Sequence, residues 1–278
     1  MSDLVEMLAL PFLACLLLGG ILSYLGIHVL KREVIFIDIA VAQVAAIGAL
    51  VAHLLFHVEE DSLISYLGSL VCVLAMAGFY ALVRHRVLEI SVEAVIGISY
   101  AITAAGAMFL MGVVPGHNHA HEMLAGALLW IMWPQMLTSL LVCTAVGVVL
   151  WLFRRPLAAV SEDYARAAAR GMKVVWWDFF FYALLGTVIT VAVRISGVVT
   201  VFALLIIPAT TSALFATAWL PRMLLAWLTV LLGSAGGLLF SYYLDFSVGP
   251  TIALCLGVLL AASAALLRLR ARPMPESA

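Results

Sequence analysis

Three histidines at alternating positions precede a carboxylate in the segment HNHAHE, residues 117–122. Neutral imidazoles and carboxylates bind Zn²⁺, and Mn²⁺ accepts a larger share of oxygen ligands. Two further histidines are spaced i, i+4, which predicts rings on one face of a helix. The candidate metal ligands are therefore His53, His57, His117, His119, His121 and Glu122. The alternatives are a solvated histidine-rich loop and, for the spaced pair, ordinary residues at a membrane interface.

The composition indicates which elements must position these side chains. Of the 278 residues, 66% are hydrophobic and 10% are charged, and the mean hydropathy is +1.20. A soluble domain carries about 25% charged residues, so this excess of apolar side chains predicts a protein that lies in a bilayer. A net charge of −1 without a basic arm gives no sign of a nucleic-acid partner. Four cysteines inside apolar runs, without CxxC spacing, predict neither a disulfide framework nor a zinc ribbon.

Nine apolar runs are long enough to cross the hydrocarbon as helices, which takes about 20 residues. They lie near residues 8–30, 34–57, 63–83, 94–114, 124–153, 178–195, 197–218, 222–244 and 249–268. The runs around 124–153 and 195–218 could be broken or re-entrant. The sequence therefore predicts an all-α polytopic membrane protein, one domain over residues 1–278, with eight or nine transmembrane helices.

The loops between these runs alternate in charge. Arg and Lys gather in every second loop, which the positive-inside rule assigns to the cytoplasm, and Arg194 is a cation that does not follow this alternation. With nine crossings, the N-terminus lies outside. The C-terminus, with a flexible tail at about 269–278, then lies in the cytoplasm.

Ionisable groups inside the apolar runs are few, and each is a functional candidate because a charge in a membrane is costly. Asp38, within VIFIDIAVAQVAA, is the clearest, and the alternative for it is a helix cap near the cytoplasmic face. A proton-driven carrier is expected to hold a relay of carboxylates at mid-membrane, and these runs have almost none. Neither GxxxxGK[ST] nor HExxH occurs. The pattern argues against an enzyme and indicates a conduit powered by another subunit.

One loop on the predicted cytoplasmic side differs from the others. The stretch SEDYARAAARGMKV, from residue 161, predicts a short amphipathic helix that Ser161 or Asp163 caps and Gly171 closes. Arg166 and Arg170 are spaced i, i+4 on it. A short helix between two membrane spans could be displaced by a conformational change in a partner domain that contacts it. The alternative is a helix that merely lies at the headgroups.

Several blocks of the chain resemble the permease subunits of ABC importers for zinc, manganese or iron. LKREVIFIDIAVAQVAAIGALVA, SVEAVIGI and LLFSYYLDFSVGPTIALCLGV are similar to segments of that family. EDYARAAARG is like its cytoplasmic D-x-x-x-A-x-x-x-G coupling loop, and ALLIIPATTS is like its A-L-L-I-I-P-A-x-x-A signature. The resemblance implies a coupling loop at about 155–177 with the contact residues Glu162, Asp163, Ala165, Arg166, Arg170 and Gly171.

The first block departs from the family pattern D-A-L-S-H, in which the carboxylate and the imidazole contact the ion. Aligned on Gly48, Gln43 replaces the histidine and Asp38 falls one residue early. Positions 38 and 43 are about 140° apart around a helix, so they cannot bind one ion together without a bend or a second copy. An amide oxygen is a harder ligand than imidazole. Either the path binds the ion with lower affinity, or it prefers a different ion. Pro208 in the signature completes the predicted path, as a gating hinge or as a structural kink.

The resemblance implies a homodimeric permease in a bacterial or archaeal cytoplasmic membrane, without a catalytic site and without a permanently bound cofactor. An extracytoplasmic metal-binding protein would deliver zinc or manganese, and a cytoplasmic ABC ATPase dimer would bind ATP and drive transport. Two alternatives stay open. One is a permease for chelated iron with a wide, aromatic-lined path, and the other is a stand-alone carrier or channel for divalent metal.

Overall fold

The computed structural model describes the backbone of residues 2–58, 62–86, 90–113 and 128–270, and the side chains of these ranges except 2–6, 86, 111–113 and 270. Within them, every regular element is a helix, as the composition predicts. The elements are α1 (Ser2–Arg32), α2 (Ile37–Phe56), α3 (Leu63–Arg86), α4 (Val92–Val113), η1 (Leu128–Trp130), α6 (Trp133–Leu152), α7 (Arg154–Glu162), α8 (Tyr164–Ala169), α9 (Val174–Phe215), α10 (Trp219–Leu244) and α11 (Val248–Arg270). The segment HNHAHE and residues 271–278 of the predicted tail lie outside the described residues.

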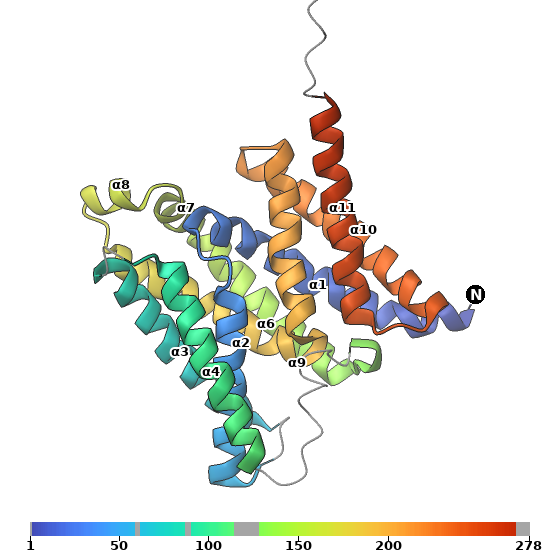
Figure 1. The fold of residues 1–278 in the computed structure, drawn as a ribbon, viewed down its shortest axis with the longest axis horizontal. Coiled ribbons are helices and arrows are strands. Elements are labelled where there is room, and N and C mark those ends of the chain that lie inside the picture. The colour runs from blue at the N-terminus through green and yellow to red at the C-terminus, as the bar shows by residue number, and fades with distance from the viewer. Residues whose placement is uncertain (1, 59–61, 87–89, 114–127, 271–278) are drawn as a thin grey trace, which may run out of the picture.

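Eight of the described helices are long and apolar enough to cross a membrane, and α9 is long enough to do so twice. Its 42 residues would span about 63 Å if straight, roughly twice the hydrocarbon thickness. Gly197 interrupts the helix at φ 77° and ψ 161°, and the chain turns back there (Figure 1). The break predicted between the runs 178–195 and 197–218 is confirmed, and the described helices then provide nine candidate crossings.

Glycine, rather than proline, turns the chain within α9. A residue with φ near 77° is strained unless it lacks a Cβ, which is why Gly197 can take this place. Pro208 is buried and lies in the regular stretch after the break. That stretch packs directly on α1, because a Cβ built on Gly26 would lie 1.9 Å from the Leu205 carbonyl oxygen.

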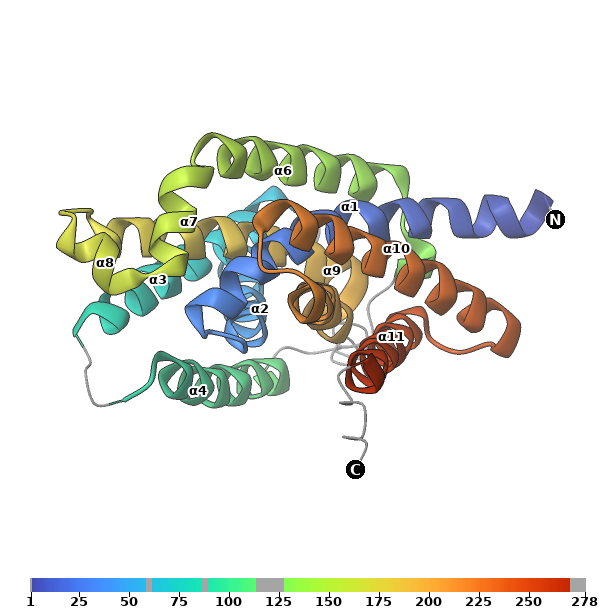
Figure 2. The same ribbon diagram turned by 90° about the horizontal axis from the view of Figure 1, so that it is seen from above.

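Viewed from above, the helices form three layers (Figure 2). α6 lies on one side, α4 and α11 lie on the opposite side, and α1, α2, α3, α9 and α10 lie between them. Among the candidate spans, α9 is the most deeply buried and α11 the least. The described core is therefore built around α9, while α4 and α11 present apolar side chains outward.

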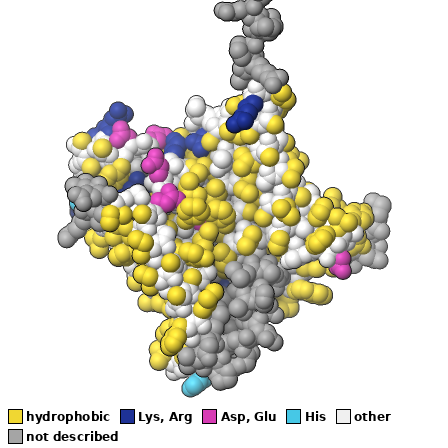
Figure 3. All heavy atoms as spheres, in the orientation of Figure 1, with side chains coloured by type: hydrophobic (Ala, Val, Ile, Leu, Met, Phe, Trp, Pro, Cys, Tyr) yellow, Lys and Arg dark blue, Asp and Glu magenta, His cyan; other side chains and the backbone are white. Residues whose placement is uncertain are grey.

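The two ends of the molecule differ in charge. The ends of α1, α3, α6 and α11, which carry the predicted cytoplasmic basic residues, lie at the same end as α7 and α8 (Figure 1). Charged side chains gather near α7 and α8, whereas hydrophobic side chains cover the middle (Figure 3). The alternation read from the loops therefore matches the arrangement of the helices.

Candidate functional site

α2 carries two of the three residues of the predicted translocation path, Asp38 and Gln43; the third, Pro208, lies on α9. Its N-cap position is Phe36, so Asp38 lies within the first turn and is not the cap. Asp38 is 1% exposed, and neither carboxylate oxygen has a hydrogen-bond partner among the described residues. A buried carboxylate without partners costs several kcal/mol, offset in part by the positive end of the helix dipole. Because burying this carboxylate is unfavourable for folding, Asp38 is a functional candidate.

Gln43 belongs to a different face of the same helix. α2 is regular from Ile37 to Phe56, so Gln43 projects about 140° away from Asp38 around the axis. Asp38 is buried, whereas Gln43 is half-buried. Within one chain, therefore, the two side chains do not share a coordination sphere.

A close glycine contact fixes the position of α2 against α3. A Cβ built on Gly48 would lie 2.5 Å from the Gly68 carbonyl oxygen, and one built on Gly68 would lie 2.8 Å from the Gly48 oxygen. The two backbones meet with no room for a side chain. This contact sets the register of α2, and with it the positions of Asp38 and Gln43.

The far end of α2 carries the predicted histidine pair. His53 Nδ1 lies 2.7 Å from the Val58 carbonyl oxygen, so this nitrogen carries a proton and donates to the carbonyl. The helix ends at Phe56, and His57 caps it at φ 51°, with its N–H bonded to the His53 carbonyl. The prediction of two rings on one helical face is thus wrong for His57, because a left-handed residue leaves the helix.

Metal ligation by these histidines stays a prediction. In the ranges that the structure covers, no group of three or more His, Cys, Asp or Glu side chains comes together as a metal site. The other proposed ligands, His117, His119, His121 and Glu122, lie outside those ranges.

Arg194, the cation that breaks the charge alternation, is accommodated by α3. Its Nη2 donates to Ser65 Oγ at 3.1 Å and to Ser69 Oγ at 3.0 Å, and the guanidinium carbon lies 3.9 Å from the Tyr66 ring centroid. Hydroxyls and an aromatic face therefore replace the solvent that a guanidinium otherwise requires. These contacts explain how Arg194 can lie away from the end of the molecule that carries the other basic residues.

The predicted coupling loop contains two helices rather than one. α7 and α8 are separated by Asp163, whose Oδ1 accepts the Arg166 N–H at 2.8 Å. This bond identifies Asp163 as the cap and excludes Ser161, which lies inside α7. Gly171, at φ 78°, closes α8 as predicted.

The end of α8 is a Schellman turn, which explains why glycine stands there. Met172 N donates to Ala167 O at 3.2 Å, and Gly171 N donates to Ala168 O at 2.9 Å. Ala167 is buried in a small cluster with Val160 and Val174. The remaining predicted contact residues on α8 and its ends are exposed on the outer surface: Ala165, Arg166, Arg170 and Gly171.

Glu162 at the end of α7 holds the segment to the membrane helices. Its Oε1 accepts the Trp219 indole N–H at 2.6 Å and Lys31 Nζ at 3.0 Å. The Lys31 ammonium also lies 4.1 Å from the Trp219 ring centroid. These bonds, first that from Trp219 and then that from Lys31, hold the pKa of the Glu162 carboxyl below its usual value. The residue predicted as an ATPase contact therefore joins α7 to α1 and α10.

Ser161 makes a second and buried attachment. Its hydroxyl donates to the Leu157 carbonyl at 2.9 Å, which leaves the oxygen to accept from Arg32 Nε at 2.8 Å. His28 Nδ1 lies 2.9 Å from the same oxygen, so the ring donates from that nitrogen. α7 is thus bonded to the end of α1 through two side chains.

The ends of α1, α3 and α9 meet in a buried ion-pair cluster beside Ser161. Arg32 Nη1 and Arg84 Nη1 both donate to Oδ1 of Asp178, the latter over 3.2 Å. The side chains of Arg32 and Asp178 are fully buried, and the Arg32 guanidinium carbon lies 4.1 Å from the Phe181 ring centroid. A short chain of polar contacts therefore links α7 to the ends of three membrane helices, α1, α3 and α9.

The sequence prediction missed this cluster. The positive-inside rule predicts only that Arg32 and Arg84 lie on the cytoplasmic side, and it does not single out Asp178. A lone acid within WWDFFFY could have been noticed by the same reasoning as Asp38. Its partners lie 146 and 94 residues away, a separation that no local spacing reveals.

Known proteins share both the sequence and the arrangement of these helices. The chain is 30% identical over 162 residues to the manganese import system permease protein ScaB of Streptococcus parasanguinis, a match that covers 58% of each protein. It is 27% identical over 252 residues to the manganese transport system membrane protein MntC of Halalkalibacterium halodurans, which covers 89% of this chain and 83% of that one.

A solved structure has the same fold. The structure titled PsaBC from Streptococcus pneumoniae in complex with Fab matches with a TM-score of 0.80 at 20% identity, over 97% of this chain and 99% of the matched chain. At that identity the likeness concerns the fold. The sequence model of the ABC 3 transport family matches residues 5–266, nearly the whole chain, which confirms the predicted resemblance. The chain is a member of the ABC 3 transport family.

Proposed function

We propose that the chain is the permease subunit of an ATP-driven importer for a divalent metal ion, with manganese favoured over zinc. The observation that carries the proposal is the similarity to a manganese transport membrane protein over 89% of the chain. The donor types agree with this choice, because Asp38 and Gln43 both offer oxygen, and Mn²⁺ accepts oxygen more readily than Zn²⁺ does.

In this proposal the ion passes along α2 and meets its two polar side chains in separate steps. Asp38 supplies a buried negative charge near the α7–α8 end, and Gln43 supplies a neutral oxygen on the half-buried face. Neither step holds the ion with a full set of protein ligands. Weak binding at each step suits transport, because a site that binds tightly slows release. His53 and His57, with the histidines of residues 117–122, would collect the ion at the opposite end.

A second copy of the chain would complete the path. α4 and α11 lie on the same side of the molecule, opposite α6 (Figure 2), and their exposed apolar side chains include Ile102, Phe109, Leu254 and Val258. We place the second copy on this side. The chain would lie in a bacterial or archaeal cytoplasmic membrane, with the α7–α8 end and the C-terminus in the cytoplasm.

The exposed face of α8 would contact the ATPase. Arg166 and Arg170 are exposed there, while Glu162, Ser161 and the Asp178 cluster connect the segment to the membrane helices. Reversing both arginines to glutamate should leave assembly of the permease intact and reduce transport per ATP hydrolysed by about tenfold, since the charge of the contact surface would change sign. Arg268→Glu, a charge reversal at the end of α11 and outside the coupling loop, is the control. Unchanged coupling in the double variant would remove α8 from the contact.

The test of the proposed function is ATPase stimulation in the reconstituted complex. The permease, an ATPase subunit and a metal-binding protein are assembled in vesicles, and hydrolysis is measured with Mn²⁺, Zn²⁺ or Fe²⁺ on the delivery protein. The proposal expects the largest stimulation with Mn²⁺. Hydrolysis that no divalent ion changes would contradict it.

A further inference from the structure

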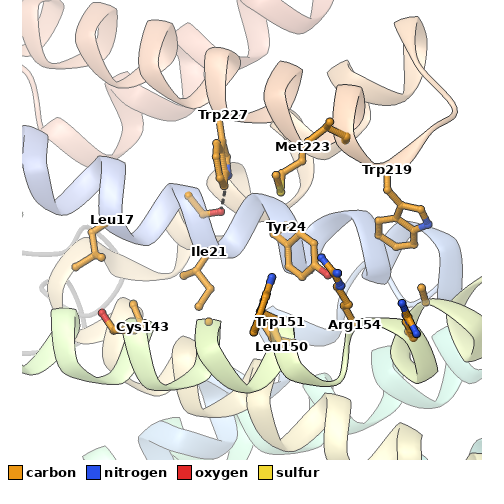
Figure 4. A pocket seen from close by; sticks show the side chains of 16 residues that line it. Leu17, Ile21, Tyr24, Cys143, Leu150, Trp151, Arg154, Trp219, Met223 and Trp227 are labelled. Carbon is orange, nitrogen blue, oxygen red and sulfur yellow. Dashed lines mark hydrogen bonds between the residues drawn. The ribbon is translucent and has the colours of Figure 1, made fainter.

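A groove opens between α1, α6, α7 and α10 (Figure 4). Its outer wall, α6, lies on the side opposite α4 and α11 (Figure 2). Its volume is about 740 Å³, and its walls are mostly apolar, with Leu17, Ile21 and Leu150 among them. Two glycines keep it open. No described atom lies within 4 Å of a Cβ built on Gly20, and one built on Gly147 meets Ile21 Cδ1 at 4.0 Å.

The length of the groove corresponds to one leaflet of a bilayer. From Cys143 to Leu152 the chain rises about 14 Å along α6, and the whole hydrocarbon layer is about 30 Å thick. α6 ends at Leu152, and the chain then turns into α7, so Arg154 stands where the membrane span ends. The groove therefore runs from the headgroup level to about the middle of the membrane.

Cationic and aromatic side chains stand at the headgroup end. Arg154 and Arg155 line the groove and are exposed, and within the described ranges neither pairs with a carboxylate. Arg154 extends into the groove beside the Tyr24 ring (Figure 4), with its guanidinium carbon 5.5 Å from the Trp151 ring centroid. The nearby carboxylate of Glu162 is already bonded to Trp219 and Lys31. The guanidinium groups of Arg154 and Arg155 are therefore both available to bind an anion at the headgroup end of the groove.

Trp227 divides the apolar part of the groove. Its indole N–H donates to the Gly20 carbonyl at 3.0 Å, which is the dashed line in Figure 4. A second hollow of about 520 Å³ adjoins the first and shares Gly20 and Trp227 with it. Its remaining lining is aliphatic, with Leu16, Leu228 and Leu231. The two hollows offer separate places for two hydrocarbon chains.

We infer that this groove binds one anionic phospholipid from the leaflet on the α7–α8 side. Arg154 and Arg155 hold the headgroup phosphate, for which guanidinium is suited. The two acyl chains lie on either side of Trp227. Because Ala158 and Trp219 also line the groove, the lipid touches the segment that couples to the ATPase. That consequence rests on the proposed function, whereas the binding itself does not.

Native mass spectrometry of the purified full chain tests the inference. The protein in mild detergent is offered equal amounts of phosphatidylglycerol and phosphatidylcholine with matched acyl chains, and the retained lipid is counted. The wild type should retain one phosphatidylglycerol per chain. Arg154→Gln with Arg155→Gln should weaken that retention by about tenfold. Gly147→Leu, which fills the groove from α6, should remove it.

The matched control is Arg268→Gln with Arg270→Gln, which removes the same charge from the end of α11, away from the groove (Figure 2). It should retain phosphatidylglycerol as the wild type does. Equal retention of the two lipids by the wild type, or no loss in either groove variant, would overturn the inference. A change in oligomeric state with Gly147→Leu would instead assign the groove to a second copy. Lipid retention does not require metal transport, so failure here leaves the proposed function standing.

Discussion

Asp38 and Asp178 are both buried carboxylates near the α7–α8 end of the membrane helices, and their surroundings are opposite. Asp178 accepts bonds from two arginines, Arg32 and Arg84. Asp38 is 1% exposed, and neither of its oxygens has a partner in the described part of the chain. The same side chain thus faces two cations in one place and the N-terminal end of its own helix in the other.

The difference separates a structural role from a transport role. A carboxylate between two guanidiniums neutralises their positive charge, and its removal leaves that charge buried without an anion, which is strongly destabilising. A carboxylate without partners contributes no such stabilisation, and its own burial is unfavourable. Asp178 therefore joins the helices, and Asp38 remains available for a cation that is only briefly present.

The largest expected effect is on folding at Asp178. Asp178→Ala should lower the free energy of unfolding by about 3–5 kcal/mol, because the fully buried Arg32 would be left without an anion, and the partly buried Arg84 would lose the same partner. Asp178→Asn should cost less, since its amide oxygen still accepts a hydrogen bond. Reversible unfolding in bicelles measures both variants, and wild-type stability of the alanine variant would show that the cluster does not stabilise the fold.

The second effect is on transport at Asp38. Asp38→Asn keeps the shape and removes the charge, so it should reduce metal uptake by about tenfold or more, which corresponds to about 1.4 kcal/mol of lost attraction. Its stability should equal or exceed that of the wild type. Uptake is measured per folded protein, with Asp178→Asn as the comparison. Full uptake by the Asp38 variant would remove this residue from the path.

A smaller effect concerns the choice of ion at Gln43. Gln43→His restores an imidazole on the half-buried face of α2 and should shift the preference toward Zn²⁺ over Mn²⁺ by about threefold to tenfold. Competition between the two ions in uptake measures the shift. Gln43→Asn retains an amide oxygen and serves as the control. An unchanged ratio in the histidine variant would place position 43 away from the ion.

The smallest effect is the pH dependence contributed by Glu162. Bonds from Trp219 and Lys31 lower its pKa below the ordinary value of 4.5, so the folded state favours the charged form. Its contribution to stability is therefore present above about pH 4.5 and is lost as the pH falls through the lowered pKa. The side chain is 52% exposed, so the contribution is only about 0.5 kcal/mol.

Glu162→Gln isolates this contribution. The difference in stability between the wild type and the variant should be constant from neutral pH down to about pH 5 and shrink at lower pH. Thermal unfolding of both proteins over that range measures it. A difference that grows on acidification would contradict the assignment of the lowered pKa.

Local patterns predicted most of the fold. The length of the apolar runs and the alternation of charge between loops predicted the candidate membrane spans. The N-cap at Asp163, the helix end at Gly171 and the break at Gly197 follow from the conformational preferences of single residues. The placement of His57 on a helical face failed because a left-handed cap ends α2 one residue earlier. The contacts of Asp178, Ser161 and Glu162 were out of reach, because their partners come from distant helices whose packing no local spacing encodes.

The most direct test of the account is uptake of radioactive manganese into sealed vesicles, with the permease alone or with its ATPase and delivery protein, in the presence of ATP. The account predicts accumulation against a gradient only with the partners present, and its loss in the Asp38→Asn complex. Accumulation against a gradient by the permease alone would contradict the claim that this chain is a passage whose driving force comes from another subunit.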